Sequence, residues 1–143
     1  MIKEFEVLTP EERTLLLKAP VIVSVLALSS FKEISKAQKD EAVKLAHMKT
    51  FTELDLLLPY YEEVDEHFKK DLDGYIEQFF PFTAENCIAI KEEMNRVDKI
   101  IDKLDRLYAG LLRKSLAGYA RHINNATHSV FQDLIFPVAF SKL

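Results

Sequence analysis

The sequence predicts one all-α domain of five to seven helices that spans residues 1–143. Glycine and proline number only three and five, which suits long helices better than a turn-rich β fold. No segment alternates apolar and polar residues with the period of two that indicates a strand. The second half of the chain carries apolar residues at alternating spacings of four and three, which places them on one side of a helix. These residues are Ile90, Met94, Val97, Ile101, Leu104, Tyr108 and Leu111.

The first predicted helix begins at Thr9-Pro10-Glu11-Glu12 and reaches the loop at residues 29–33. A capping hydroxyl, proline at the first helical position and glutamate at the third are typical of a helix start. Pro20 lies inside this helix, and we expect a kink there because its ring removes a backbone donor. The helix is apolar on more than one face, which predicts a place near the centre of the core.

The next helix is predicted to open at Ser35, where Gln38 completes a second capping box, and to run to about Lys49. Residues 50–53 repeat the pattern with Thr50 and Glu53, which predicts a short third helix that stops before residue 59. Residues 59–80 keep helical spacing until the proline at position 81.

Thr83 is predicted to cap a long helix from residue 84 to about residue 109, which would extend for about 39 Å. Gly110 is expected to bend the chain, and a further helix ends near Asn124-Asn125. A final short apolar segment over residues 130–136 precedes Pro137.

The charge of the chain is weakly acidic and unevenly distributed. The formal net charge is −4, and residues 53–77 hold nine acidic residues against Lys69 and Lys70. Nothing in the sequence resembles the basic surface of a nucleic-acid binder, so we expect no nucleic-acid partner.

Several features predict a cytoplasmic protein. Cys87 is the single cysteine and has no neighbouring histidine to act as its base, so we expect a reduced, packed thiol. No apolar run approaches the ~20 residues of a membrane span, and the first residues lack a signal-peptide pattern. The alternative is a peroxisomal protein of a eukaryote, because Ser141-Lys142-Leu143 matches the peroxisomal import tripeptide.

A di-iron centre is disfavoured by the positions of the four histidines. Such a site needs Glu-x-x-His, since this spacing directs both ligands to a shared metal. The residues three positions before the histidines are instead Lys44, Val64, Tyr119 and Asn125. A ferritin-like or hemerythrin-like site is therefore not expected.

The best supply of metal ligands is the acidic segment 53–77. Its candidates are Glu62, Glu63, Glu66 and His67, and oxygen-rich clusters suit calcium or magnesium. The competing interpretation is a solvated helix face with ion pairs from Asp65 to Lys69 and from Glu66 to Lys70. No other cofactor is expected.

A basic stripe runs along the predicted long helix and into the next one. Acidic residues run beside it, and Glu92 with Arg96 and Asp102 with Arg106 have the spacing of favourable ion pairs. We interpret the stripe as a mixed solvated face rather than a phosphate-binding surface. Its members are Arg96, Lys99, Lys103, Arg106 and Arg113.

Polar residues gather again in the C-terminal third, around His122 and His128. One hypothesis is a small-molecule or enzymatic pocket between helices, lined by Arg121 and His122. The alternative is a helix end whose asparagine and histidine side chains satisfy free carbonyl groups.

Two stretches of the chain resemble the tellurite-resistance TerB-like family. The first comprises Leu8-Thr9-Pro10-Glu11-Glu12 and, after a loop, Ile34-Ser35-Lys36-Ala37-Gln38-Lys39-Asp40-Glu41; the second comprises Lys114-Ser115-Leu116-Ala117 and Tyr119-Ala120-Arg121-His122-Ile123. The resemblance implies an all-helical, internally duplicated, bacterial cytoplasmic protein, and several such proteins are thought to bind metal through acidic loop residues. Ser29-Ser30-Phe31 stands where the family has Asp-Gly, and Gln38 stands where it has glutamate. No metal ligand is therefore carried over.

The sequence thus predicts a non-enzymatic helical domain that binds a protein partner or acts in a stress response. Divalent-metal binding by residues 53–77 is the first alternative, and a pocket near His122 is the second. The C-terminal residues Phe136, Val138, Phe140 and Leu143 are expected either to cover the core or to form a homodimer contact.

Overall fold

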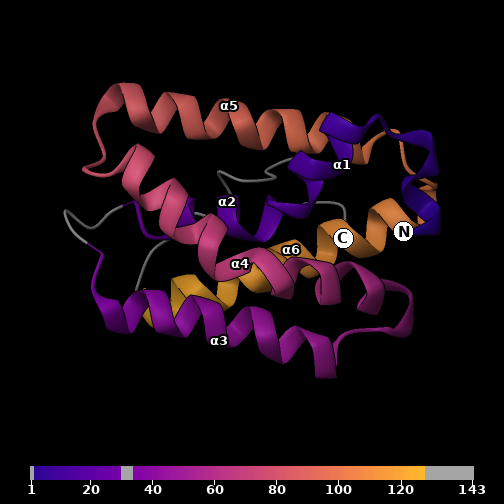
Figure 1. Ribbon diagram of the computed structural model, residues 1–143, viewed down its shortest axis with the longest axis horizontal. Coiled ribbons are helices and arrows are strands. Elements are labelled where there is room, and N and C mark those ends of the chain that lie inside the picture. The colour runs from indigo at the N-terminus through magenta and orange to yellow at the C-terminus, as the bar shows by residue number, and fades with distance from the viewer. Residues whose placement is uncertain (1, 30–33, 128–143) are drawn as a thin grey trace.

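The computed structural model describes residues 2–29 and 34–127 (Figure 1). The chain begins with a 3-10 helix, η1 (Lys3–Val7), followed by α1 (Pro10–Leu17) and α2 (Ala19–Ala27). The predicted start of α1 is confirmed, because the Glu12 amide donates to Thr9 Oγ1 at 3.1 Å and the Thr9 amide donates to Glu12 Oε1 at 2.9 Å.

The expected kink at Pro20 is instead a complete break between two helices. The chain turns at Lys18, and Pro20 falls in the first turn of α2. The first amides of a helix have no partner within it, so proline is tolerated at this position. An unbroken helix would need that hydrogen to bond the Leu16 carbonyl. The hydroxyl of Tyr60, on α4 (Leu58–Phe79), donates to this carbonyl at 2.7 Å instead.

Helix α2 occupies the centre of the core, as its apolar composition predicted. All nine of its residues are buried. It packs against α4, α5 (Ala84–Ile101) and α6 (Arg106–Thr127). Its one polar side chain, Ser24, donates to the Pro20 carbonyl at 2.7 Å, so the buried hydroxyl is satisfied.

The third helix, α3 (Lys36–Thr52), starts where predicted and ends later than predicted. The Ser35 capping box is confirmed, with the Gln38 amide 3.1 Å from Ser35 Oγ. The helix start predicted at residue 50 is wrong: Thr50 lies within α3 and its hydroxyl donates back to the His47 carbonyl at 2.7 Å. Only a 3-10 turn, η2 (Asp55–Leu57), separates α3 from α4.

The long helix predicted from residue 84 to residue 109 is also wrong. Thr83 caps it as expected, with the Asn86 amide 3.1 Å from Thr83 Oγ1, but α5 ends at Ile101. The chain turns over residues 102–105, and α6 then runs through Gly110 without interruption. Asp105 starts α6, because its carboxylate accepts hydrogen bonds from the amides of Leu107 and Tyr108 at 3.1 and 3.3 Å.

The apolar stripe that suggested one helix is shared by two helices and the turn between them. Its members are buried up to Tyr108, and Leu111 packs partly buried against the same core. Because α5 and α6 face one core, the spacing of their apolar residues continues across the turn.

In Figure 1, α5 and α3 lie on opposite sides of the molecule, with α2 and α6 between them and α4 crossing the face. Helix α4 packs on α3, and α1 packs on α5. Over residues 2–29 and 34–127 there are six α-helices and no strand, so the predicted all-α fold is confirmed. Within the same residues, no helix combines the length and the apolar character required to cross a membrane.

Candidate functional site

Large apolar side chains are exposed at the end of α3 and in the segment that follows it. Phe51 is 76% exposed and Leu54 is 58% exposed, and Met48 and Leu56 are exposed near them along the chain. We call these four residues the α3 rim. The Phe51 ring meets the His47 ring edge-on, with 5.3 Å between centroids. Several exposed apolar side chains so close together in the chain favour a contact with another molecule.

A further exposed apolar side chain stands in the first turn of α6. Leu107 is 67% exposed and borders an open groove of about 630 Å³. A Cβ atom added to Gly110 would meet no heavy atom within 4 Å, so the space beside this residue is open. We call this hollow the α6 groove, and its lining residues are Asp105, Arg106, Leu107, Gly110, Leu111 and Lys114.

A chain of hydrogen bonds joins the α3 rim to α6. The Tyr61 hydroxyl lies 2.6 Å from Ser115 Oγ, Ser115 Oγ donates to Glu53 Oε2 at 2.9 Å, and Lys49 Nζ lies 3.1 Å from the same Glu53 oxygen. Glu53 caps the end of α3 and lies between Phe51 and Leu54 in the chain. The bond to Ser115, together with the packing of η2 on α6, therefore holds the rim against α6.

This polar chain is suited to holding structure rather than to chemistry. Burial raises the pKa of the Tyr61 hydroxyl, which stays protonated and acts as the donor to Ser115. Ser115 uses its own hydrogen on Glu53, whose carboxylate is also paired with the Lys49 ammonium. The sequence alone does not reveal this set, since only the four-residue spacing of Lys49 and Glu53 pointed to it.

The α6 groove carries a positive side chain at each end. Arg106 and Lys114 are exposed, and neither has an ion-pair partner among the residues that the structure describes. The carboxylate of Asp105 is engaged by the first amides of α6. The predicted pair of Asp102 with Arg106 does not form, because Asp102 Oδ1 accepts a hydrogen bond from Arg113 at 2.6 Å.

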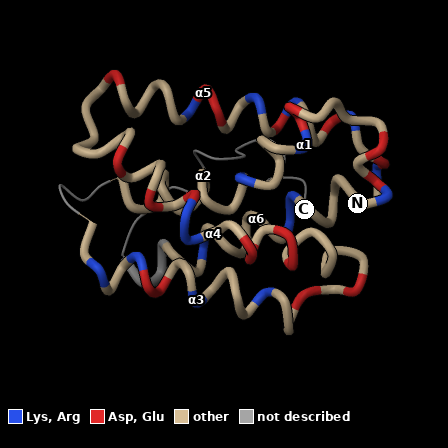
Figure 2. Tube along the Cα trace, viewed as in Figure 1, with Lys and Arg blue, Asp and Glu red and all other residues tan. Residues whose placement is uncertain are grey.

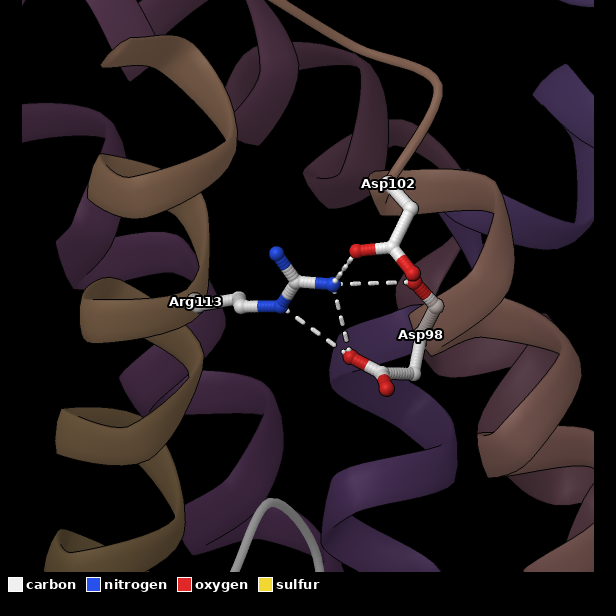
Figure 3. A network of polar contacts seen from close by, with 3 residues as sticks. All are labelled: Asp98, Asp102 and Arg113. Atoms are coloured by element: carbon white, nitrogen blue, oxygen red, sulfur yellow. Dashed lines mark hydrogen bonds and ion pairs between the residues drawn. The ribbon is translucent and has the colours of Figure 1, made fainter. Parts of the chain in front are cut away.

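Arg113 fixes the turn between α5 and α6, as Figure 3 shows. Its Nε and Nη2 atoms both donate to Asp98 Oδ1, at 3.0 and 2.9 Å, and Nη2 also donates to the Asp98 carbonyl at 3.0 Å. The Arg113 side chain is only 16% exposed. The prediction that Arg113 belongs to a solvated face is therefore wrong, because it lies between the two helices and binds both carboxylates.

The other members of the basic stripe lie in a mixed-charge setting, and Figure 2 shows acidic and basic residues alternating along α5. Arg96 pairs with Glu93 at 3.7 Å rather than with Glu92. Lys103 pairs with Glu12, and this ammonium and the Thr9 amide hold the pKa of the Glu12 carboxyl below its ordinary value. Arg96, Lys99 and Lys103 line a second open groove of about 430 Å³ between α1 and α5.

The candidate metal ligands share α4 but do not converge on one point. Glu62, Glu66 and His67 are exposed and Glu63 is half-buried, and His67 Nε2 lies 3.9 Å from Glu66 Oε2. Over the described ranges, no group of three or more acidic, histidine or cysteine side chains is arranged to hold a metal ion. Metal binding stays a prediction, which a rise in melting temperature with millimolar calcium or magnesium would support.

The predicted ion pairs of this acidic segment are replaced by another contact. Asp65 Oδ2 lies 2.9 Å from Nδ1 of His47 on α3, rather than beside Lys69. Glu66 likewise faces His67 and not Lys70. Asp65 therefore links α4 to α3, which sequence spacing along one helix could not indicate.

The remaining candidates are dispersed. His122 is exposed on α6, with Nε2 4.0 Å from Glu41 Oε1 on α3. Cys87 is half-buried in the first turn of α5, where its amide bonds the Thr83 carbonyl at 2.9 Å. His128, the predicted segment 130–136, the C-terminal apolar residues and the tripeptide at 141–143 lie outside the described residues, as does most of the loop at 29–33.

Comparison of the chain with models of known protein families, with curated proteins and with solved structures gives no significant match.

Proposed function

We propose that this chain is a non-catalytic domain that binds another protein through the α3 rim and the α6 groove. The observation that carries the proposal is the exposure of Phe51, Leu54 and Leu107, three large apolar side chains on segments that the Glu53–Ser115 bond holds together. Large apolar side chains in contact with water are unfavourable, and burial against a partner would remove that cost.

The composition of this surface supports a protein partner. Phenylalanine, methionine and arginine are enriched in protein interfaces, and the surface contains Met48, Phe51 and Arg106. In the α6 groove, Leu107 and Leu111 lie between Arg106 and Lys114 along the helix, and apolar side chains flanked by charged ones are usual in a protein contact. The buried polar chain beneath it gives the surface a fixed shape, and this lowers the ordering cost of binding.

A non-enzymatic role is supported by the state of the nearby polar groups. The hydroxyls of Tyr61 and Ser115 and the carboxylate of Glu53 already satisfy one another. We extend the proposal to a TerB-like stress-response protein of the bacterial cytoplasm. The motifs at residues 8–12 and 34–41 support that extension, and the confirmed helix starts at Thr9 and Ser35 fall within them.

The test is affinity capture from cells that naturally make the chain, using the wild-type protein and the double variant Phe51→Ser, Leu107→Ser. Both substitutions replace exposed side chains, so circular dichroism should show an unchanged fold. We expect the wild type to retain a defined protein that the double variant loses.

The matched control is Ile88→Ser on α5, where the native side chain is 59% exposed and lies outside both surfaces. This variant should retain the partner. If capture is equally strong with the double variant, or is lost equally with Ile88→Ser, the proposed surface is wrong.

A further inference from the structure

We infer that the α6 groove receives an amphipathic helix whose apolar side is flanked by carboxylates; this inference rests on the proposed function and specifies the chemistry of the partner. Three features of the groove converge on such an occupant, namely its apolar middle, the open space at Gly110 and its two cations, which have no ion-pair partner within residues 2–29 and 34–127.

The middle of the groove fits the apolar side of a helix. Leu107 and Leu111 are one turn apart on the same side of α6, with Gly110 beside them. The open space at Gly110 lets a second backbone approach closely, since no side chain stands in the way. Two helices pack at 8–10 Å between axes, and small residues at the contact favour the shorter distances.

The ends of the groove specify the charge of the occupant. Arg106 and Lys114 are eight residues apart on α6, which corresponds to about 12 Å along the axis, or roughly two turns. A partner helix with acidic residues two turns apart would meet both cations while its apolar side covers the two leucines. The chain as a whole carries a net charge of −4, so this positive pair is a local departure from its overall charge.

Asp105 is the acidic residue in the lining of the groove, and with Arg106 and Lys114 it leaves this lining with a formal net charge of +1. Its carboxylate is held by the amides of Leu107 and Tyr108 and is therefore committed to starting α6. Charged groups at the edge of a contact mainly set specificity and the rate of association. The two cations thus select an acidic partner, and the leucines supply the buried area.

The experiment measures binding of two synthetic helical peptides to the full chain by fluorescence anisotropy. Both carry the same leucine face; one has glutamates two turns apart beside it, and the other has lysines at those positions. We expect the glutamate peptide to bind at least about tenfold more tightly than the lysine peptide, with an affinity that falls as salt is added.

Reversing the charge of the two cations tests whether the preference for the glutamate peptide arises in the α6 groove. The variant Arg106→Glu, Lys114→Glu should lose the preference for the glutamate peptide. The matched control Arg96→Glu, Lys99→Glu makes the same change in net charge at the groove between α1 and α5 and should keep the preference.

Equal binding of both peptides, or binding of neither, would overturn the inference, whereas the capture experiment with Phe51 and Leu107 separately decides the proposed function. Self-association that Leu107→Ser abolishes would place a second copy in the groove and also overturn it. A crosslink from Lys114 to Lys142 of the same chain would place the chain's own C-terminal residues there, with the same consequence.

Discussion

Two tyrosines that touch the same phenylalanine differ in what their hydroxyl groups meet. The rings of Tyr60 and Tyr108 both contact Phe5 edge-on, with centroids 6.0 and 6.1 Å away. Tyr60 donates to the carbonyl of Leu16 that the break at Pro20 leaves open. The Tyr108 hydroxyl is buried and has no hydrogen-bond partner among the described residues. The hydroxyl of Tyr60 is therefore expected to stabilise the fold, and that of Tyr108 to destabilise it.

Replacing each tyrosine by phenylalanine should separate these cases. Tyr60→Phe removes the hydroxyl that donates to a buried carbonyl and should lower the free energy of unfolding by about 1–3 kcal/mol. Tyr108→Phe removes a hydroxyl that bonds nothing described and should be neutral or stabilising by up to about 1 kcal/mol. Urea unfolding followed by circular dichroism measures both changes. A loss at Tyr108 as large as that at Tyr60 would mean that its hydroxyl has a partner.

Helix starts could be predicted from the sequence, whereas helix breaks could not. The side chains of Thr9, Ser35 and Thr83 each accept a hydrogen bond from the amide three residues later, so the capping pattern is local and can be recognised in the sequence. The break at residues 102–105 was hidden because α5 and α6 line one core and keep the apolar spacing across the turn. Asp105 was the available signal, but its spacing from neighbouring acids favoured a solvated helix face. Thr50 misled for the opposite reason, since a threonine hydroxyl also bonds backward inside a helix.

The start of α6 depends on Asp105, and its removal should be measurable. Asp105→Ala deletes the acceptor for two amides and should cost roughly 0.5–2 kcal/mol of stability. Asp105→Asn keeps a capping oxygen and should cost much less. Chemical denaturation of both variants makes the comparison, and equal losses would show that the carboxylate charge, not the cap, matters.

The polar link from α6 to the end of α5 depends on the two donor nitrogens of the Arg113 guanidinium. Arg113→Lys keeps the charge but cannot bond Asp98 through two nitrogens, so it should lower stability by about 1 kcal/mol. The loss is modest because Asp98 and Asp102 remain in contact with water. Arg106→Lys, on the same helix and without an ion pair to any residue that the structure describes, is the control and should leave the denaturation midpoint unchanged. An equal effect of the two variants would contradict the role of the two donor nitrogens.

Across the whole molecule, the sequence indicated the core far better than the surface. Apolar periodicity identifies the residues that face inward, and the stripe from Ile90 to Tyr108 is indeed buried. The α3 rim and the α6 groove are defined by what remains uncovered, which depends on how distant segments meet. Leu107 lies outside the apolar stripe of the sequence, but neither its exposure nor that of Phe51 was predicted, because it depends on which other segments cover α3, η2 and α6.

The stability of the fold should fall sharply in alkaline solution, because all five tyrosines are buried. Burial raises the pKa of each hydroxyl above the ordinary value of 10.0, and in Tyr75 the neighbouring Glu93 adds to the effect. A pKa raised in the folded state contributes stability that is complete below the unfolded value and is lost as the pH rises above it. Tyrosinate absorbance should therefore stay low through about pH 10 and appear at higher pH together with the loss of helical circular dichroism. The urea-unfolded chain, as control, should titrate near pH 10; ionisation there with the helices intact would refute the prediction.

The complete enclosure of α2 has a consequence for how the chain reaches its native state. A helix with no polar face is not stable alone in water, so α2 reaches its native state only when α4, α5 and α6 pack around it. The N-terminal and C-terminal parts of the chain therefore have to fold together rather than one after the other. A nascent fragment released before α6 is synthesised would expose the nine apolar-rich residues of α2 to water, and such a fragment would precipitate or require a chaperone.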